Sequence, residues 1–427
     1  MSRACTGCSC SKNGAKVILE RRQVSTNVVC VSGTFASNVN RNFGVFVKER
    51  VRAVAALGKY DMRVVAPTPW FPKLPVRTRW AHWAHFPQHE WVDGFAVGRP
   101  RYWMVPKIGG YFEADLMRPG VEREVEKLVA SGFAFELVDA HFVYPNGVVG
   151  SHLAEKYRVP LVMTGRGTEM VCFPNLPIMG QRIRSAIPRC SEFIALSREI
   201  AEAFERLGAP RDRITVIPNG VDCEKFRPIA QAVAREQLGL PADRRILVSV
   251  GNRLENKGFH LLIEALPWIR ERYPETMVVI VGGRTPYGAD FTPVIEAAVR
   301  HHGVEQHVRL VGSWPHDELA VWYSAADLFV LLSSREGSPN VLMEALACGT
   351  PAVATPVGGI PEMLRDERLG IVLPERSVPA AVEGIIEALG RGWDRGAIRR
   401  IMEQQDWSVT ARAVAAVFER ALQSRGF

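Results

Sequence analysis

The most informative segment of this chain is Glu336-Gly-Ser-Pro-Asn-Val-Leu-Met-Glu344-Ala-Leu-Ala-Cys-Gly-Thr-Pro351-Ala-Val-Ala354. Ser338 is a favoured N-cap residue, and Pro339 suits the first position of a helix. The apolar residues that follow predict a helix over Pro339–Ala347, and Ala352–Ala354 has the character of a buried strand. The stretch therefore predicts a loop, a helix and a strand in direct succession.

Two glutamates flank the start of this predicted helix: Glu336 lies in the loop before it, and Glu344 lies inside it. Free backbone N–H groups at a helix start favour an anion, so the pair can hold a sugar at one end, a phosphate in the middle and a ribose at the other. Exposed carboxylates are the common alternative, but Glu344 lies on an apolar helix. A two-carboxylate hydrolase needs both acids beside one bond, and here a helix start separates them.

A second cluster of charged residues precedes the predicted helix Lys257–Arg272, in Gly251-Asn-Arg-Leu-Glu-Asn-Lys-Gly258. Arg253 offers a rigid fork for phosphate oxygens, and Lys257 offers a compact charge. A cation at a helix N-terminus is unfavourable unless an anion is bound there. This favours a phosphate site over a solvated turn.

Strands and helices alternate in two series, which begin at Asn27–Ser32 and Ile246–Val250. The first series is interrupted over residues 67–112. Such alternation predicts an α/β chain with two doubly wound parallel sheets. The predicted organisation is a disordered extension (1–24), a first Rossmann-like domain (25–218), a second (219–405), and a C-terminal helix (408–422) that follows the second sheet.

Three features of the first domain follow strands, where ligands bind in such sheets. Gly44 opens the first helix, although tight turn geometry alone also explains a glycine there. His141 ends a strand before Tyr-Pro-Asn-Gly147, and a structural histidine is the alternative. The segment Arg166-Gly-Thr-Glu169 suits a phosphate, an acceptor or a loop salt bridge.

Charge is uneven along the chain, whose formal net charge is +8. Residues 1–200 hold 27 Lys and Arg against 16 Asp and Glu, which suits an anionic membrane surface or a pyrophosphate-linked substrate. Nothing resembles a nucleic-acid-binding module. Trp, Phe and basic residues mix over residues 70–103, as in lipid-headgroup contacts, with a buried subdomain as the alternative. No long apolar run or signal peptide is evident, so we expect a cytoplasmic protein, with peripheral contact at the inner face of the plasma membrane as an option.

Several common motifs are absent from the sequence. The chain has no Asp-x-Asp, no Walker loop, and no Gly-x-Gly-x-x-Gly after the first strand. The sequence therefore lacks the main motifs that would indicate a hydride-transfer enzyme or a phosphate-loop ATPase. No metal ligand set and no cofactor are expected.

Together these residues resemble the retaining family-4 glycosyltransferases of the GT-B fold. The resemblance runs from about Val29 to Trp407. It rests on Val216-Ile-Pro-Asn-Gly-Val-Asp222, Gly251–Gly258, Ala325-Ala-Asp327 and Glu336–Gly359. First-domain segments such as Pro100-Arg-Tyr102 and His141–Gly147 are similar to the branch that builds bacterial exopolysaccharide or teichuronic acid.

The resemblance implies two such domains facing across a cleft, with a nucleotide-sugar in the second domain and the acceptor in the first. It also implies that the C-terminal helix (408–422) packs back on the first domain. It implies reaction roles for His141, Arg253, Lys257 and Glu336. It implies donor binding by Gly44, Gly251, Arg253, Lys257, Ser338, Pro339, Asn340, Val341 and Glu344.

The expected activity is metal-independent transfer of a hexose from a UDP- or GDP-sugar to a glycan acceptor, with a lipid-linked glycan as the leading expectation, in polysaccharide biosynthesis. Two alternatives stay open: a nucleotide-sugar epimerase of the same fold, and an inactive sugar-nucleotide-binding scaffold. This chain departs from the commoner family pattern at two places. The loop after Glu336 is Gly-Ser-Pro-Asn instead of Gly-Phe-Gly, which leaves the identity of the donor sugar open. The first-domain loop has one glycine instead of two, which weakens the assignment of Gly44 to donor binding.

Overall fold

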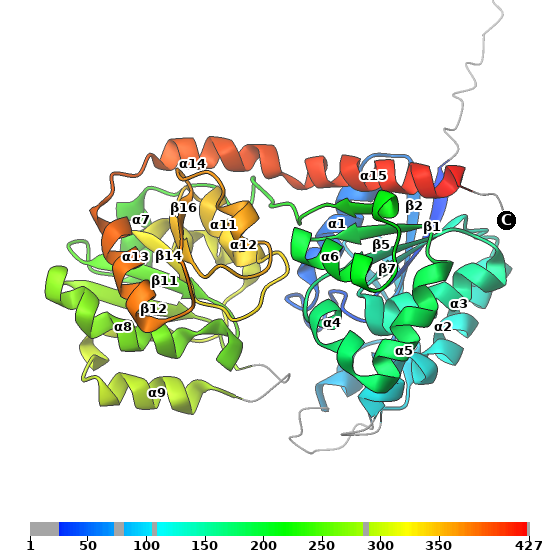
Figure 1. Cartoon of the computed structure of the whole chain (residues 1–427), viewed down its shortest axis with the longest axis horizontal. Coiled ribbons are helices and arrows are strands. Elements are labelled where there is room, and N and C mark those ends of the chain that lie inside the picture. The colour runs from blue at the N-terminus through cyan, green and yellow to red at the C-terminus, as the bar shows by residue number, and fades with distance from the viewer. Residues whose placement is uncertain (1–24, 72–80, 105–108, 285–289, 425–427) are drawn as a thin grey trace, which may run out of the picture.

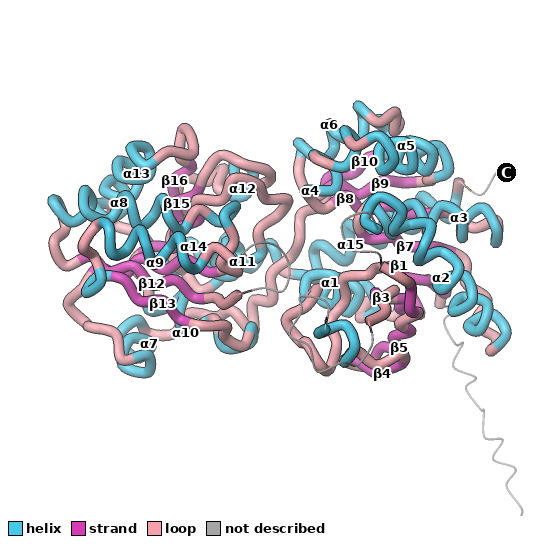
Figure 2. The backbone as a smooth tube through the Cα atoms, turned by 90° about the horizontal axis from the view of Figure 1, so that it is seen from below, coloured by secondary structure: helices cyan, strands magenta, loops and turns pink. Residues whose placement is uncertain are grey.

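The computed structural model describes residues 25–71, 81–104, 109–284 and 290–424. These residues form two lobes that lie side by side, and α14 (Arg395–Met402) and α15 (Trp407–Gln423) run along one side of both (Figure 1). Each lobe has a central sheet with helices around it (Figure 2). The predicted N-terminal extension, residues 1–24, lies outside the described residues.

The first lobe contains, within the described residues, an eight-stranded sheet in the order β10-β9-β8-β7-β1-β2-β5-β4. Its neighbouring strands are parallel except β4, which pairs antiparallel with β5 at the edge. Its strands are β1 (Thr26–Val31), β2 (Tyr60–Val65), β4 (His89–Val92), β5 (Phe95–Gly98), β7 (Leu137–His141), β8 (Leu161–Gly165), β9 (Glu192–Ala195) and β10 (Ile214–Val216). A separate ribbon pairs β3 (Thr68–Pro69) with β6 (Arg101–Tyr102).

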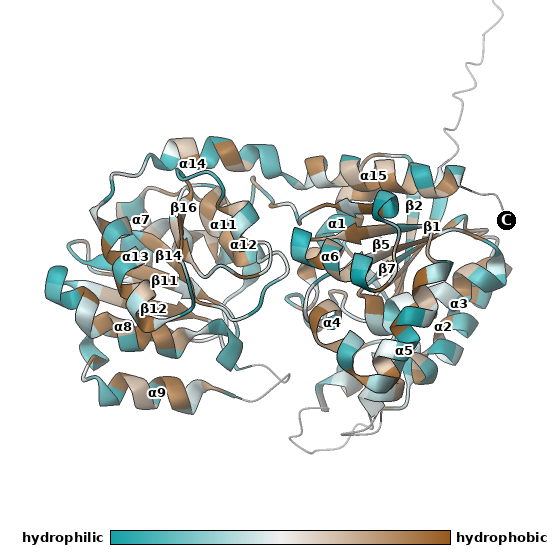
Figure 3. Ribbon diagram, viewed as in Figure 1, coloured by the Kyte–Doolittle hydropathy of each residue, from teal (hydrophilic) through white to brown (hydrophobic). Residues whose placement is uncertain are grey.

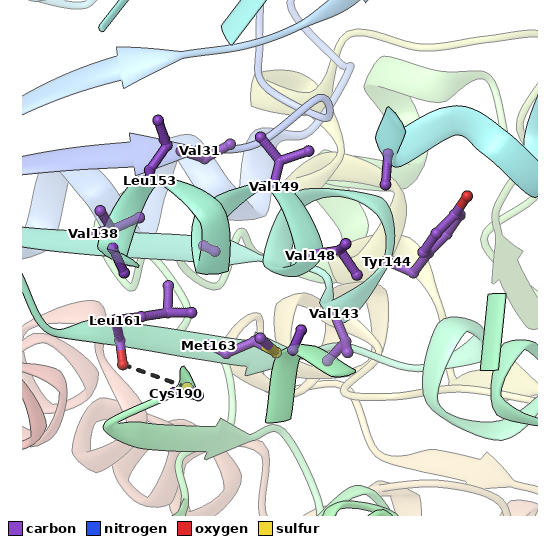
Figure 4. Packing of buried hydrophobic residues seen from close by; sticks show 14 of the residues in the cluster. Val31, Val138, Val143, Tyr144, Val148, Val149, Leu153, Leu161, Met163 and Cys190 are labelled. Atoms are coloured by element: carbon purple, nitrogen blue, oxygen red, sulfur yellow. Dashed lines mark hydrogen bonds between the residues drawn. The ribbon is translucent and has the colours of Figure 1, made fainter. Parts of the chain in front are cut away.

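Both faces of this sheet are covered, because successive residues of a strand point to opposite faces. On β1, Val29 and Val31 pack into one core cluster and Val28 and Cys30 into the other. Figure 4 shows the first cluster, where α3 covers β7 and β8 and the Cys190 thiol donates to the Leu161 carbonyl at 3.4 Å. The helices of this lobe are α1 (Val45–Ala55), α2 (Glu113–Ala130), α3 (Val148–Tyr157), α4 (Thr168–Val171), α5 (Pro177–Ala186) and α6 (Arg198–Arg206).

The second lobe contains a six-stranded, wholly parallel sheet among the described residues, in the order β13-β12-β11-β14-β15-β16. Its strands are apolar and its helices turn polar residues outward (Figure 3). The strands are β11 (Arg245–Val250), β12 (Thr276–Val281), β13 (Val308–Val311), β14 (Leu328–Leu331), β15 (Ala352–Ala354) and β16 (Gly370–Val372). The helices besides α14 are α7 (Gln231–Leu238), α8 (Phe259–Arg272), α9 (Thr292–His301), α10 (Ala320–Ala325), α11 (Asn340–Ala347), α12 (Ile360–Met363) and α13 (Val378–Gly390).

The chain crosses between the lobes at two adjacent places. Val221 and Asp406 form an isolated parallel bridge, and Val221 N–H donates to the Gln405 carbonyl at 3.0 Å. After the second crossing, α15 packs on α1 and β9, and its apolar residues join the same core cluster as Val28. The predicted α/β class with two doubly wound domains is confirmed.

Candidate functional site

The start of α11 differs by one residue from the predicted start. The helix begins at Asn340, and Pro339 occupies the N-cap position with an extended backbone and no side-chain cap. The prediction that Ser338 caps the helix and Pro339 opens it was wrong. The reason is that Ser338 serves the first crossing between the lobes: its hydroxyl accepts from Asn219 N–H at 3.4 Å. The N–H groups of Asn340 and Val341 lie in the first turn, where a helix offers no internal acceptor.

Glu344 is buried inside α11, and two side chains hold its carboxylate. Tyr323 Oη donates to Oε2 at 2.7 Å, and His316 Nε2 lies 2.8 Å from Oε1. Burial alone would lower the pKa of His316, but the Glu344 carboxylate and its hydrogen bond outweigh burial and raise it. The second lobe therefore presents a fixed acid beside the first turn of α11.

Glu336 lies on the other side of the helix start and is held by a cation. Lys257 Nζ lies 2.6 Å from Glu336 Oε1, and the Ser333 hydroxyl donates to the same oxygen at 2.7 Å. Lys257 closes the short turn after β11, and Ser333 follows β14, so two neighbouring strand ends supply this cluster. The structure thus brings together Lys257 and Glu336, which are far apart in the sequence.

Arg253 and Gly251 lie in the turn that follows β11. One terminal nitrogen of Arg253 donates to the Val311 carbonyl at 3.0 Å, whereas its buried Nε has no hydrogen-bond partner among the described residues. Gly251 N–H continues the ladder to Val281, and a side chain at Gly251 would lie against the Lys257 stem at 3.5 Å. The turn therefore carries two cations at the carboxyl edge of the sheet.

His141 is fully buried at the end of β7, and both its ring nitrogens are engaged. Arg166 lies 2.7 Å from Nδ1, and Asp139 lies 2.9 Å from Nε2. Because a guanidinium can only donate, Nδ1 accepts and Nε2–H donates to Asp139. Burial lowers the pKa of His141 to about 4, so the ring is neutral near pH 7. Contact of His141 with a sugar stays a prediction; in this structure the ring positions Arg166.

Gly44 has a positive φ of 67° at the start of α1. A Cβ at this position would lie 2.5 Å from the Thr34 carbonyl oxygen of its own lobe. The turn itself therefore requires glycine, which is the geometric alternative noted above. The same loop reaches the other lobe, since the Asn42 amide lies 3.5 Å from the Trp314 carbonyl.

The two lobes touch where the Glu336 loop meets the end of β8. A Cβ at Gly337 would collide with the Arg166 carbonyl oxygen. Arg166 donates to Asn219 Oδ1 at 3.3 Å, and Asn219 Nδ2 donates to Asn340 Oδ1 at 2.9 Å. Hydrogen bonds therefore run from His141 through Arg166 and Asn219 to the first residue of α11.

A cavity of about 450 Å³ lies beside this contact. Its walls come from both lobes and are mostly polar, including Arg166, Glu169, Asn256, Arg335 and Glu336. Glu169 accepts from the Arg166 backbone N–H at 2.5 Å, and burial raises its pKa. The cavity can accept a molecule rich in hydroxyl groups.

One buried group of Cys30, Asp139 and His141 has atoms close enough to hold a metal ion. The guanidinium of Arg50 lies 3.3 Å from Asp139, and that of Arg166 lies 2.7 Å from His141. Two cations already neutralise this acid, and burial raises the pKa of the Cys30 thiol well above its ordinary value. The group therefore fits a closed ion-pair network better than a metal site. Cys5, Cys8 and Cys10, which lie close together in the sequence, are outside the described residues.

Sequence reasoning missed His316, Tyr323 and Asn219 as parts of the site. His316 and Tyr323 follow β13, and their only link to Glu344 is tertiary. Asn219 lies in the segment Val216–Asp222, but the sequence analysis predicted no role for it.

Among the described residues, no helix combines the length and apolar character needed to cross a bilayer.

Comparisons with known protein families cover both lobes. A family described as glycosyl transferases group 1 matches residues 231–404, and a family described as glycosyltransferase family 4 matches residues 43–225. A D-inositol 3-phosphate glycosyltransferase of Thermobispora bispora is 30% identical over 310 residues, covering 68% of this chain and 71% of that protein. A protein of Bacillus subtilis assigned to teichuronic acid biosynthesis as a glycosyltransferase is 27% identical over 364 residues, covering 84% of this chain and 88% of that protein.

Solved structures share the fold over almost the whole chain. Sucrose-phosphate synthase from Thermosynechococcus elongatus superimposes with a TM-score of 0.74 at 21% identity, covering 93% of this chain and all of that chain. Anabaena HepE in complex with UDP superimposes with a TM-score of 0.68 at 18% identity, covering 92% of this chain and 99% of that chain.

Proposed function

The chain belongs to the family-4 glycosyltransferases of the GT-B fold, and from this premise we propose that it transfers a hexose from a UDP- or GDP-sugar to a lipid-linked glycan, with retention of anomeric configuration. The observation that carries the proposal is the pair of acids on either side of the α11 start. Glu344 is held by Tyr323 and His316, and Glu336 is held by Lys257. Each acid has its own partners, so each can serve a different part of one ligand.

Glu344 binds the ribose of the donor in this proposal. A carboxylate has about four lone-pair positions, and Tyr323 and His316 use one on each oxygen. The remaining positions can accept from two ribose hydroxyl groups. Because the acid is already fixed by its protein partners, little side-chain entropy is lost when the ribose binds.

The diphosphate lies between the two acids, against the first turn of α11. Arg253 and Lys257 supply two positive charges, and the N–H groups of Asn340 and Val341 supply donors. Lys257 has three donors, so it can bind Glu336 and a phosphate oxygen together. These groups stabilise the charge that develops on the leaving diphosphate, which is why we propose catalysis without a metal ion.

Transfer breaks the bond between the anomeric carbon and the phosphate oxygen and forms a bond from that carbon to the acceptor hydroxyl oxygen. The acceptor attacks from the face that the diphosphate leaves, and the hydroxyl proton passes to a phosphate oxygen. Glu336 contacts the donor sugar, and neutral His141 holds Arg166 at the cleft. The first lobe binds the acceptor, and water is excluded where the lobes meet.

The relative assigned to teichuronic acid biosynthesis, which covers most of the chain, supports a polymer-building role. A test of the donor site is a thermal-shift screen with UDP, GDP and their sugars, with and without EDTA. We expect stabilisation by UDP or GDP that persists in EDTA and falls in Lys257→Ala and Glu344→Ala. No stabilisation by any nucleotide would overturn the donor site. Donor turnover at full rate without any acceptor would instead favour an epimerase.

A further inference from the structure

Two exposed tryptophans lie side by side on the first lobe. The Trp70 side chain is 41% exposed and that of Trp103 is 66% exposed. Their ring centroids are 4.3 Å apart, with the ring planes tilted by 44°. Large exposed apolar groups that sit together mark interaction sites more often than isolated ones do.

The short β3–β6 ribbon holds this pair in place. Trp70 N–H donates to the Tyr102 carbonyl at 2.7 Å. Arg101 lies under the ribbon and donates to the carbonyls of Pro69, Trp83 and Phe86. The two indoles therefore have a fixed geometry before any ligand arrives, which reduces the entropy lost on binding.

The pair lies at the edge of the first sheet where the proposed reaction occurs. Trp70 directly follows β3, and Trp103 directly follows β6. These short strands come after β2 and β5, which run parallel to β7, whose end carries His141. Trp83, which Arg101 binds, packs on Phe43 of the Gly44 loop with ring centroids 5.6 Å apart. A continuous set of contacts thus leads from the indole pair to the loop that touches the second lobe.

We infer that Trp70 and Trp103 form a stacking platform for a pyranose ring of the acceptor glycan, at a position removed from the ring that receives the transferred sugar. This inference rests on the proposed function. The C–H-rich face of a pyranose is apolar and rigid, and it matches the flat face of an indole.

Among the described residues, a membrane contact fits these two tryptophans less well. Binding to anionic headgroups needs free basic side chains beside the aromatic rings. Arg101 is the cation that the ribbon itself carries, and its guanidinium is turned inward onto three backbone carbonyls. Trp80, Lys73, Arg77 and Arg79 lie outside the described residues.

The experiment titrates the full chain, in the presence of UDP, with cello-, malto- and chito-oligosaccharides from mono- to hexasaccharides, and follows binding by isothermal calorimetry. We expect at least one series to bind, with affinity rising from di- to hexasaccharide. Trp70→Ala and Trp103→Ala should each raise Kd by about tenfold, the size of effect seen when a key aromatic contact is removed. Trp103→Phe should stay within about threefold of the original chain, because a flat ring remains.

Two exposed tryptophans elsewhere provide matched controls: Trp91 on the edge strand β4 and Trp268 on α8 are 67% and 58% exposed. Trp91→Ala and Trp268→Ala should leave Kd unchanged. Equal losses in these controls would overturn the platform, as would no oligosaccharide binding by a chain that UDP or GDP still stabilises. Co-sedimentation with phosphatidylglycerol vesicles that is lost in Trp70→Ala and Trp103→Ala, without an effect on sugar binding, would assign the pair to a membrane instead. Failure of the nucleotide shift itself would refute the donor site and is measured separately.

Discussion

Lys257 Nζ lies 2.6 Å from Glu336 Oε1, so the turn after β11 and the loop before α11 are joined by an ion pair at the proposed donor site. Lys257→Ala should lower kcat/KM by about 10²–10³-fold, because it removes a charge aimed at the leaving group. Steady-state kinetics with the donor that gives a thermal shift measures this. Lys156→Ala removes a surface ion pair to Glu126 instead and should have no effect on rate. Equal rates for the two variants would exclude the proposed role of Lys257.

Tyr323→Phe tests how far Glu344 depends on its buried partner. Removing the hydroxyl leaves one oxygen of a buried carboxylate without a donor, which should cost about 1–3 kcal/mol in the free energy of unfolding and weaken nucleotide binding. Chemical denaturation and nucleotide titration measure the two effects. The control is Tyr60→Phe, because the Tyr60 hydroxyl donates to the Ala415 carbonyl at 3.3 Å in the first lobe. Nucleotide affinity should not change in the control.

The raised pKa of His316 predicts that the free energy of unfolding falls at alkaline pH. Its pKa is raised in the folded chain, since the Glu344 carboxylate outweighs the effect of burial. The stabilisation is therefore complete below the unfolded pKa of about 6.5 and is lost as pH rises through the higher folded value. The difference in unfolding free energy between the original chain and His316→Gln should shrink steadily above about pH 6.5. A constant difference from neutral to alkaline pH would contradict this.

The lowered pKa of His141 predicts that the free energy of unfolding falls at acid pH. Burial lowers its pKa to about 4 in the folded chain, whereas the unfolded value is about 6.5. The unfolded chain binds the proton first, so stability should fall as pH drops from about 6.5 to about 4, by roughly 3 kcal/mol in full. Urea unfolding at a series of pH values measures this. His141→Gln should lack this part of the acid sensitivity, and an unchanged slope in that variant would refute the assignment.

Gly337→Ala tests the contact between the lobes. Its Cβ would overlap the Arg166 carbonyl oxygen, and backbone on both sides leaves little room to adjust. We expect kcat/KM to fall at least about tenfold, because small displacements of positioning groups are costly, whereas the melting temperature changes little. Gly392→Ala, where an added Cβ has no atom within 4 Å, is the control. Full activity of Gly337→Ala would show that the lobes need not meet there.

Most of the framework could be predicted because it follows from local pattern. The strand Ala352–Ala354 has the predicted bounds, and β7 ends at His141 as predicted. Within residues 67–112, the β3–β6 ribbon depends on tertiary pairing and could not be predicted in this way. The β4–β5 hairpin across Asp93 and Gly94 carries a local turn signal, which the sequence analysis missed. Helix α2 contains Pro119, which weakens a helical pattern, and no helix was predicted there.

The residues of the site could be predicted singly but not as partners. Glu336, Glu344, Arg253 and Lys257 follow strand ends, which sequence periodicity locates. The hydrogen bonds from Tyr323 and His316 to Glu344 join separate elements, and no spacing rule reports them. Ser338 shows the same limit: its residue type favours a cap, but the chain between the lobes uses its hydroxyl instead.

The C-terminal helix has a consequence for the order in which the chain can fold on the ribosome. Val414, Val417 and Phe418 of α15 complete the core around Val28 and Val47 of the first lobe. The lobe whose strands are synthesised first therefore keeps an apolar face uncovered until α15 has been synthesised. The second lobe is contiguous in sequence and can close its core before α15 is synthesised, so the first lobe completes its core after the second.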